Sequence, residues 1–109
     1  MLRMEKTGSK LCVYLQGEID HCSASQIRTE IETALQNKDI QALHVDLSKV
    51  SFIDSSGIGM LIGRYKTMAS KGGSISAGGL QESVKRLYHV AGLHRIIPIV
   101  ELGGEHGVK

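Results

Sequence analysis

The residues that could do chemistry are concentrated in segment 54–59, DSSGIG, which combines one acid, two adjacent hydroxyls and two glycines. An apolar, strand-like run precedes this segment and a helical pattern follows it. A serine at a helix start lies where backbone N–H groups lack partners and where the helix dipole favours negative charge. Such a serine can cap the helix, help to hold an anion or accept a modification from another enzyme. The residue types alone leave these alternatives open.

A hydrolytic role for either serine is poorly supported. A nucleophile elbow has the pattern Gly-x-Ser-x-Gly, which exposes the hydroxyl on a sharp strand-to-helix turn. The pattern needs a glycine two residues before the serine. Ile53 occupies that position for Ser55 and Asp54 occupies it for Ser56, so neither serine fits the pattern. We therefore predict no catalytic residues and no enzymatic activity.

Nucleotide and metal sites also find little support. Gly57, Gly59 and Gly63 loosely resemble a dinucleotide fingerprint, but the spacing is one residue too long and Ile62 occupies the third glycine position. We interpret Gly59 and Gly63 as residues that let a helix approach the sheet closely. No C-x-x-C or H-x-x-x-H spacing is present, so we expect neither a metal nor a cofactor.

The elements that must position the DSSGIG segment begin with a strand at 11–15, where apolar and polar residues alternate. A helix is expected from Ser23, with Gln26 as its capping-box partner three residues later. A second alternating run at 43–47 predicts another strand, and further apolar residues continue from it toward Asp54. The DSSGIG segment thus lies between a strand and the next helix.

The clearest helical signal covers 58–69, where apolar residues recur at three- and four-residue spacings. A short strand is expected at 74–77 and a third helix at 84–91. Residues 96–100 predict a final strand, which Pro98 places at a sheet edge. The polar, glycine-rich tail at 103–109 is expected to be flexible.

This order of elements predicts one α/β domain over residues 1–109. Strands separated by helical crossovers pair in parallel and place the helices against the sheet. We therefore expect a mixed, mostly parallel sheet with helices packed against it.

Composition narrows the functional classes. The net charge is +2, cationic and anionic residues are interspersed, and the aromatic residues are three tyrosines and one phenylalanine. Without a basic stripe and interleaved aromatics, direct DNA binding is not expected. No apolar run approaches the length of a membrane span or of a secretory signal, so we expect no membrane association and a cytoplasmic protein whose two cysteines are free thiols.

Five segments resemble motifs of the STAS family of anti-sigma factor antagonists. In chain order they are the loop at 17–21, segment 52–59 followed by 63–66, and helix segment 84–87 followed by 91–93. The chain is most similar to the sporulation-type antagonists that control sigma F. The resemblance extends from about residue 11 to residue 97 and implies a single STAS domain.

The resemblance implies a phosphorylation-controlled regulator of transcription. Its unphosphorylated form would bind an anti-sigma factor, a GHKL-type serine kinase, and release the sigma factor. Phosphorylation of Ser55 by that kinase would end the interaction, and a PP2C-type phosphatase would reverse it. Ser55 is thereby assigned as the acceptor and Ser56 as the helix cap. The expected partner-binding residues are Asp20, His21, Asp54, Ser55, Ser56, Gly57, Ile58 and Gly59.

Two alternatives remain at this stage. A general-stress antagonist of the same family would share these motifs. A small nucleotide-binding STAS module would instead use the helix start at Ser55 as an anion cradle.

Overall fold

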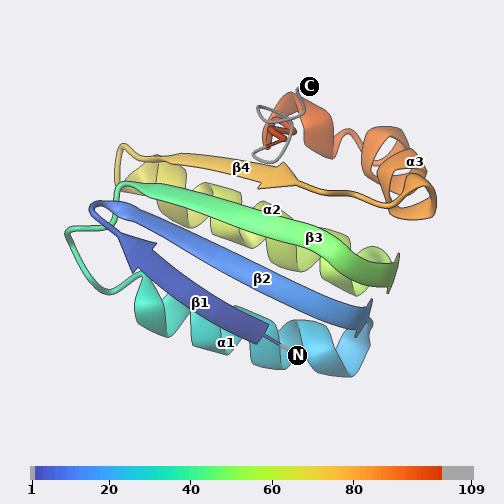
Figure 1. Cartoon of the computed structure of the whole chain (residues 1–109), viewed down its shortest axis with the longest axis horizontal. Helices are drawn as coiled ribbons and strands as arrows, with labels where there is room; N and C mark the ends of the chain where they lie inside the picture. Colours follow the sequence, from blue (N-terminus) through green and yellow to red (C-terminus); the bar gives the residue numbers. More distant parts are fainter. Residues whose placement is uncertain (1, 102–109) are drawn as a thin grey trace.

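A four-stranded sheet and two long helices dominate the computed structural model, which describes residues 2–101 (Figure 1). Alternating apolar residues build the strands, and three- to four-residue apolar spacing builds the helices. In chain order the elements are β1 (Leu2–Thr7), β2 (Lys10–Ile19), α1 (His21–Ala34), β3 (Ala42–Ile53), α2 (Ser55–Ser70), β4 (Ser74–Gly78), α3 (Glu82–Val90) and the 3₁₀ helix η1 (Leu93–Arg95).

The sheet is mixed and mostly parallel, as predicted. Its strand order is β1-β2-β3-β4, with β1 antiparallel to β2 and the remaining neighbours parallel. Because α1 connects β2 to β3 and α2 connects β3 to β4, the carboxyl ends of these parallel strands lie at the same edge of the sheet. The predicted α/β class is confirmed.

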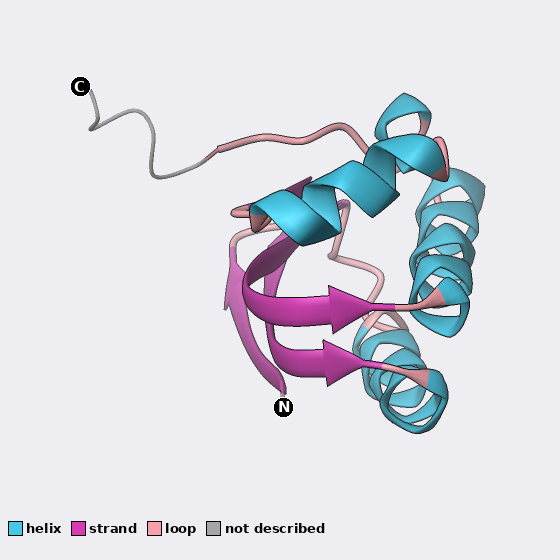
Figure 2. Ribbon diagram, turned by 90° about the vertical axis from the view of Figure 1, so that its right-hand side faces the viewer, coloured by secondary structure: helices cyan, strands magenta, loops and turns pink. Residues whose placement is uncertain are grey.

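Helices α1 and α2 lie side by side against one face of the sheet (Figures 1 and 2). The core fills the space between these helices and the sheet. Its completely buried members include Val13 of β2, Val45 of β3, Ile31 of α1 and Leu61 of α2. No helix in the described part of the chain is long and apolar enough to cross a membrane.

Strand β1 was not predicted from the sequence. Its side chains alternate, with Leu2 and Met4 half-buried and Arg3 and Glu5 exposed. The strand has one sheet neighbour, pairing with β2 through the Leu2–Leu15 register and its successors. Half-buried residues on an edge strand give a weaker hydrophobic pattern than a central strand does.

The predicted last strand at 96–100 is wrong in most of its length. Residues Leu93–Arg95 form a 3₁₀ turn, and the following segment adds an isolated parallel bridge between Ala77 and Ile99. Pro98 lacks the N–H that a continued ladder needs, although its carbonyl accepts a hydrogen bond from Ala77. The predicted tail at 103–109 lies outside the described residues.

Candidate functional site

The candidate site lies where β2 and β3 end and α1 and α2 begin. Ile19 and Ile53 pair across the two parallel strands, and the Asp54 N–H donates to the Ile19 carbonyl at 3.1 Å. Each isoleucine is followed by an aspartate that caps the next helix, namely Asp20 for α1 and Asp54 for α2. The register therefore places the predicted 20–21 loop beside the DSSGIG segment.

Asp54, not Ser56, caps helix α2. One Asp54 carboxylate oxygen, Oδ1, accepts the backbone N–H groups of Ser56 at 2.8 Å and Gly57 at 3.2 Å. The assignment of Ser56 as the cap is wrong, because a carboxylate one residue before the helix satisfies these N–H groups first. Ser55 is the first helical residue and is exposed, and its hydroxyl makes no hydrogen bond to any residue between 2 and 101.

Helix α1 begins earlier than predicted. It starts at His21, and its capping box joins Asp20 to Ser23 rather than Ser23 to Gln26. The Ser23 N–H donates to Asp20 Oδ1 at 3.0 Å, and the Asp20 N–H donates to the Ser23 hydroxyl at 2.9 Å. Hydrogen bonds from Ser23 hold the pKa of the Asp20 carboxyl below its usual value. Asp20 and His21 are both exposed, so each can contact a partner.

The glycines of α2 have different roles from those predicted. Gly57 is buried, and a Cβ there would lie 2.5 Å from Ile53 Cγ1 and 2.9 Å from Ile19 Cγ2. Gly57 is therefore the residue that lets α2 approach the sheet closely. A Cβ at Gly59 or Gly63 would meet no atom within 4 Å, so the packing role predicted for these two glycines is wrong.

A shallow groove of about 270 Å³ separates the first turns of α1 and α2. Its polar lining comes from an imidazole, two hydroxyls and a guanidinium, and its apolar lining comes from small residues and one methionine. The lining residues are His21, Ala24, Ser25, Arg28, Ser56, Gly59 and Met60. Of the predicted partner-binding residues, the groove contains His21, Ser56 and Gly59.

Farther along the two helices, an ion pair between a buried arginine and a half-buried glutamate joins α1 and α2. Arg64 Nε lies 2.7 Å from Glu32 Oε2, and the Arg64 side chain is only 7% exposed. The Thr67 hydroxyl donates to the same carboxylate oxygen at 2.7 Å. Burial lowers the pKa of the Arg64 guanidinium, with a smaller lowering by Arg28, and the Glu32 charge acts in the opposite direction. Sequence reasoning missed this pair because its two residues belong to different helices.

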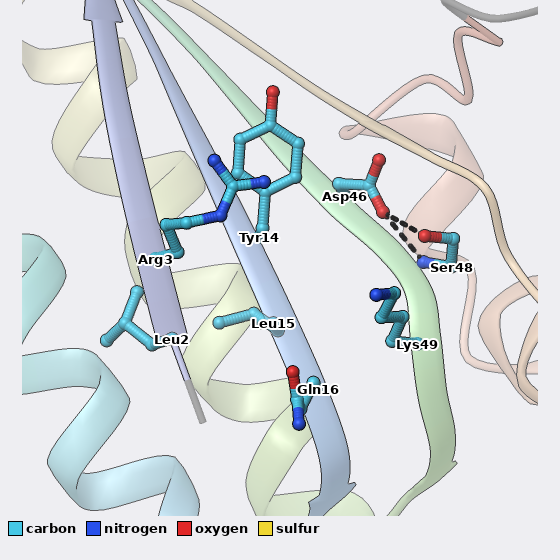
Figure 3. A pocket seen from close by; sticks show the side chains of 8 residues that line it. All are labelled: Leu2, Arg3, Tyr14, Leu15, Gln16, Asp46, Ser48 and Lys49. Atoms are coloured by element: carbon cyan, nitrogen blue, oxygen red, sulfur yellow. Dashed lines mark hydrogen bonds between the residues drawn. The ribbon is translucent and has the colours of Figure 1, made fainter.

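A second cavity, of about 310 Å³, involves strands β1, β2 and β3 (Figure 3). In it the Arg3 guanidinium lies 4.1 Å from the centre of the Tyr14 ring and also pairs with Glu5. Asp46 accepts hydrogen bonds from the Ser48 backbone at 2.9 Å and from its hydroxyl at 2.6 Å. Because these charged groups are satisfied within the chain, this cavity is a weaker candidate than the groove.

Metal ligation has no structural basis within residues 2–101. No group of three histidine, cysteine, aspartate or glutamate side chains there could hold a metal ion. Cys12 is half-buried, Cys22 is exposed, and both are free thiols. The site itself presents the Asp20 and Asp54 carboxylates, the His21 imidazole and the exposed Ser55 hydroxyl.

Comparisons with known proteins agree with this arrangement. Residues 1–102 match the family model described as STAS domain. An anti-sigma F factor antagonist of Paenibacillus polymyxa is 34% identical over 100 residues, which are 92% of this chain and 86% of that protein. An anti-sigma-B factor antagonist of Bacillus subtilis strain 168 is 38% identical over 88 residues, which are 80% and 78% of the two chains. The structure of the Bacillus cell fate determinant SpoIIAA in its phosphorylated form is similar with a TM-score of 0.75 at 23% identity, covering 98% of this chain and 97% of that one.

Proposed function

Because this chain belongs to the STAS domain family, we propose that it is an anti-sigma factor antagonist switched by phosphorylation of Ser55. The unphosphorylated form binds an anti-sigma factor that is also a GHKL-type serine kinase, and the sigma factor is released. Phosphorylation of Ser55 by that kinase ends the interaction, and a PP2C-type phosphatase restores it. The protein is a regulatory binding protein and not an enzyme.

The observation that carries this proposal is the state of the Ser55 hydroxyl. Ser55 is exposed at the first position of α2. Capping of the helix is done by the Asp54 carboxylate, so the serine is not needed to satisfy backbone N–H groups. A kinase can therefore phosphorylate this hydroxyl without breaking any hydrogen bond between it and residues 2–101.

The same location explains how one phosphate would act as a switch. A phosphoserine adds roughly −1.5 to −2 charges at neutral pH. The carboxylates of Asp54 and Asp20 cap the two neighbouring helices and would repel it, whereas the positive end of α2 would partly offset that repulsion. If this reduced complementarity cost about 3 kcal/mol of binding free energy, affinity for the partner would fall more than 100-fold.

We favour a sporulation-type antagonist that controls sigma F over a general-stress antagonist. The support is the match to the Paenibacillus polymyxa protein over most of both chains. At similar coverage an anti-sigma-B factor antagonist of Listeria monocytogenes is 31% identical, and the Bacillus subtilis anti-sigma-B factor antagonist is 38% identical over a shorter aligned region. Competition assays with sigma F and sigma B, each bound to its anti-sigma factor, distinguish the two: the favoured function requires release of sigma F.

The site assignment is tested by labelling with a candidate anti-sigma kinase and ATP. Intact-mass measurement should show one added phosphate on the wild-type chain and none on Ser55→Ala, while Ser56→Ala should be labelled like wild type. Equal labelling of Ser55→Ala would show that the acceptor lies elsewhere. Ser55→Asp should lose binding to the kinase.

A further inference from the structure

Gly59 occupies a position where the fold does not require a glycine. A Cβ at Gly59 would meet no atom within 4 Å, and the backbone there is ordinary helix. Glycine in a helix interior is unfavourable relative to alanine, because it fixes a more flexible backbone. Gly63 shares this property one turn later. Neither glycine is explained by packing within the described chain, in contrast to Gly57.

Gly59 connects the proposed phosphorylation site to the groove. It lies four residues after Ser55, and residues four apart occupy the same face of a helix. Gly59 also lines the groove between α1 and α2. A side chain at position 59 would project into space beside Ser55, so a glycine keeps that space accessible. A protein that covers the Ser55 hydroxyl is therefore within reach of the groove.

The groove lining contains one cationic side chain, Arg28, and no acid, and the Asp20 and Asp54 carboxylates cap the helices beside it. Arg28 is exposed and forms no ion pair with any residue from 2 to 101. Glu32 is one turn farther along α1, but its carboxylate is held by Arg64 and Thr67. Arg28 therefore has no anionic partner among residues 2–101, whereas the Arg64 charge is paired with Glu32.

Arg64 contributes a second unsatisfied group close to the groove. Its Nη1 atom is buried and has no hydrogen-bond partner within the described residues. Arg64 lies four residues after Met60, a groove residue, on the same face of α2, but it is not itself part of the groove lining. A buried guanidinium that lacks a full set of acceptors favours the approach of an anion.

We propose that the groove receives an acidic side chain of the anti-sigma factor, with its carboxylate on Arg28 and its methylenes on Ala24, Gly59 and Met60. The inference rests on the function proposed above and names the chemistry of the partner's contact. Charge complementarity supports a carboxylate, and the small apolar floor suits the methylene stem of a glutamate. Continuity with Ser55 supports the anti-sigma factor as its source.

Charge variants of α1 test the electrostatic part of this proposal. Binding to the kinase that labels Ser55 should weaken at least tenfold for Arg28→Glu and change little for Arg28→Lys. Lys38→Glu is the matched control, because Lys38 is exposed beyond the other end of α1. The Arg28 effect should shrink as salt is raised. Wild-type affinity for Arg28→Glu would overturn the proposal.

Glycine variants of α2 test the steric part. Gly59→Leu should fill the groove and weaken binding at least tenfold, whereas Gly63→Leu, outside the groove lining, should bind like wild type. Both Gly59→Ala and Gly63→Ala should raise the midpoint of thermal unfolding. A lower midpoint for Gly59→Ala would show that the fold needs this glycine, and equal losses of binding for both leucine variants would remove the groove's special role.

The two proposals fail in distinguishable ways. If the wild-type chain is labelled on Ser55 but Arg28→Glu and Gly59→Leu bind normally, only the groove assignment falls. If the wild-type chain is neither labelled nor bound by the kinase, both fall. Saturable binding of ATP, GTP or inorganic phosphate without protein, lost in Arg28→Gln, would assign the groove to a phosphate ligand and overturn the carboxylate proposal.

Discussion

At the level of single residues, the Asp54 carboxylate determines what Ser55 is free to do. By accepting the N–H groups of Ser56 and Gly57, it satisfies the start of α2 from outside the helix. Ser55 is left exposed at the first helical position. An acid before the helix also interacts favourably with the positive end of the dipole. Asp54 thus stabilises the start of the helix, and the Ser55 hydroxyl remains available to a partner.

Removal of this cap should be measurable without any partner. Asp54→Ala should lower the free energy of unfolding by about 1 kcal/mol, because the N–H groups of Ser56 and Gly57 lose their acceptor. Asp54→Asn keeps a side-chain oxygen and should stay close to wild type. Urea unfolding of the three proteins checks the order. An alanine variant as stable as the asparagine variant would contradict the capping role.

His44 is a titratable residue in the interior of the sheet. It is 2% exposed, and its Nδ1 lies 2.8 Å from the Ser76 hydroxyl of the neighbouring strand. Burial lowers the pKa of His44, with a further contribution from Lys10, while Asp46 and Glu101 act in the opposite direction. The folded protein therefore favours the neutral imidazole.

This shift predicts that stability falls in mild acid. Below a pH of about 6.5 the unfolded chain binds a proton that the folded His44 resists, so the free energy of unfolding decreases as the pH falls. Above that pH the contribution of His44 is constant. Urea unfolding at a series of pH values from about 5 to about 8, which spans the ordinary pKa of histidine, measures this effect. The free energy of unfolding should decline less toward acid pH for His44→Gln than for the wild-type chain. Identical declines would refute the assignment.

At the level of elements, the approach of α2 to the sheet depends on Gly57. Ile53 of β3 and the last residue of β2, Ile19, occupy the space where a side chain at this position would lie. Both isoleucines are buried in the core. The start of α2, and with it Ser55, is therefore held against the ends of two strands by close packing.

Gly57→Ala should accordingly be destabilising although alanine favours helices. The added Cβ would lie 2.5 Å from Ile53 Cγ1, and displacement of packed core groups costs about 1–3 kcal/mol. Chemical denaturation of Gly57→Ala, with Gly63→Ala as the matched control, measures the cost. Gly57→Ala should lower the free energy of unfolding and Gly63→Ala should raise it. Changes of the same sign in the two variants would contradict the packing role of Gly57.

The sequence predicted the central elements well and the peripheral ones poorly, for physical reasons. Strand 11–15 and helix 58–69 have one buried face each, and strand 43–47 keeps apolar residues at alternate positions although His44 on its other face is also buried, so hydrophobic periodicity revealed all three. Strand β1 has only half-buried and exposed side chains, so its hydrophobic pattern is weak. Its position in the sheet depends on pairing with β2, and the residues of β1 alone do not indicate that pairing. Segment 96–100 is apolar enough for a strand, but a 3₁₀ turn and Pro98 limit it to one bridge.

For the candidate site, chain order determines which of the predicted partner-binding residues lie close together. Parallel strands β2 and β3 bring the loops at Asp20 and Asp54 together, as the order of elements implies. The roles of individual glycines and of Arg64 depend on contacts between elements. Those contacts, such as the Arg64–Glu32 pair, cannot be read from spacing along one helix.

At the level of the whole molecule, the candidate site is a small part of a stable framework. The core between the sheet and helices α1 and α2 does not include the Ser55 side chain, which is exposed. The two helix caps and the Glu32–Arg64 pair hold the site's surroundings independently of that hydroxyl. A change at Ser55 therefore has no direct route into the core.

Phosphorylation of Ser55 should leave the fold essentially unchanged. The phosphate would project from an exposed position whose hydroxyl makes no hydrogen bond in the described part of the chain. Amide chemical-shift changes should be confined to residues near 20–21 and 54–59. Nuclear magnetic resonance spectra of the two forms test this, with Ser55→Ala treated in parallel as the unmodified control. Large shifts spread across the whole sheet would contradict it.

The parallel pairing of Ile19 with Ile53 also has a consequence for the time course of biogenesis. The two halves of the site belong to strands that pair only after α1 has crossed between them, and such non-local pairing forms late compared with a hairpin. In a nascent or misfolded chain, segment 54–59 is thus present but does not lie beside the Asp20 loop. A kinase that contacted both segments would therefore act only on chains in which β2 and β3 have paired.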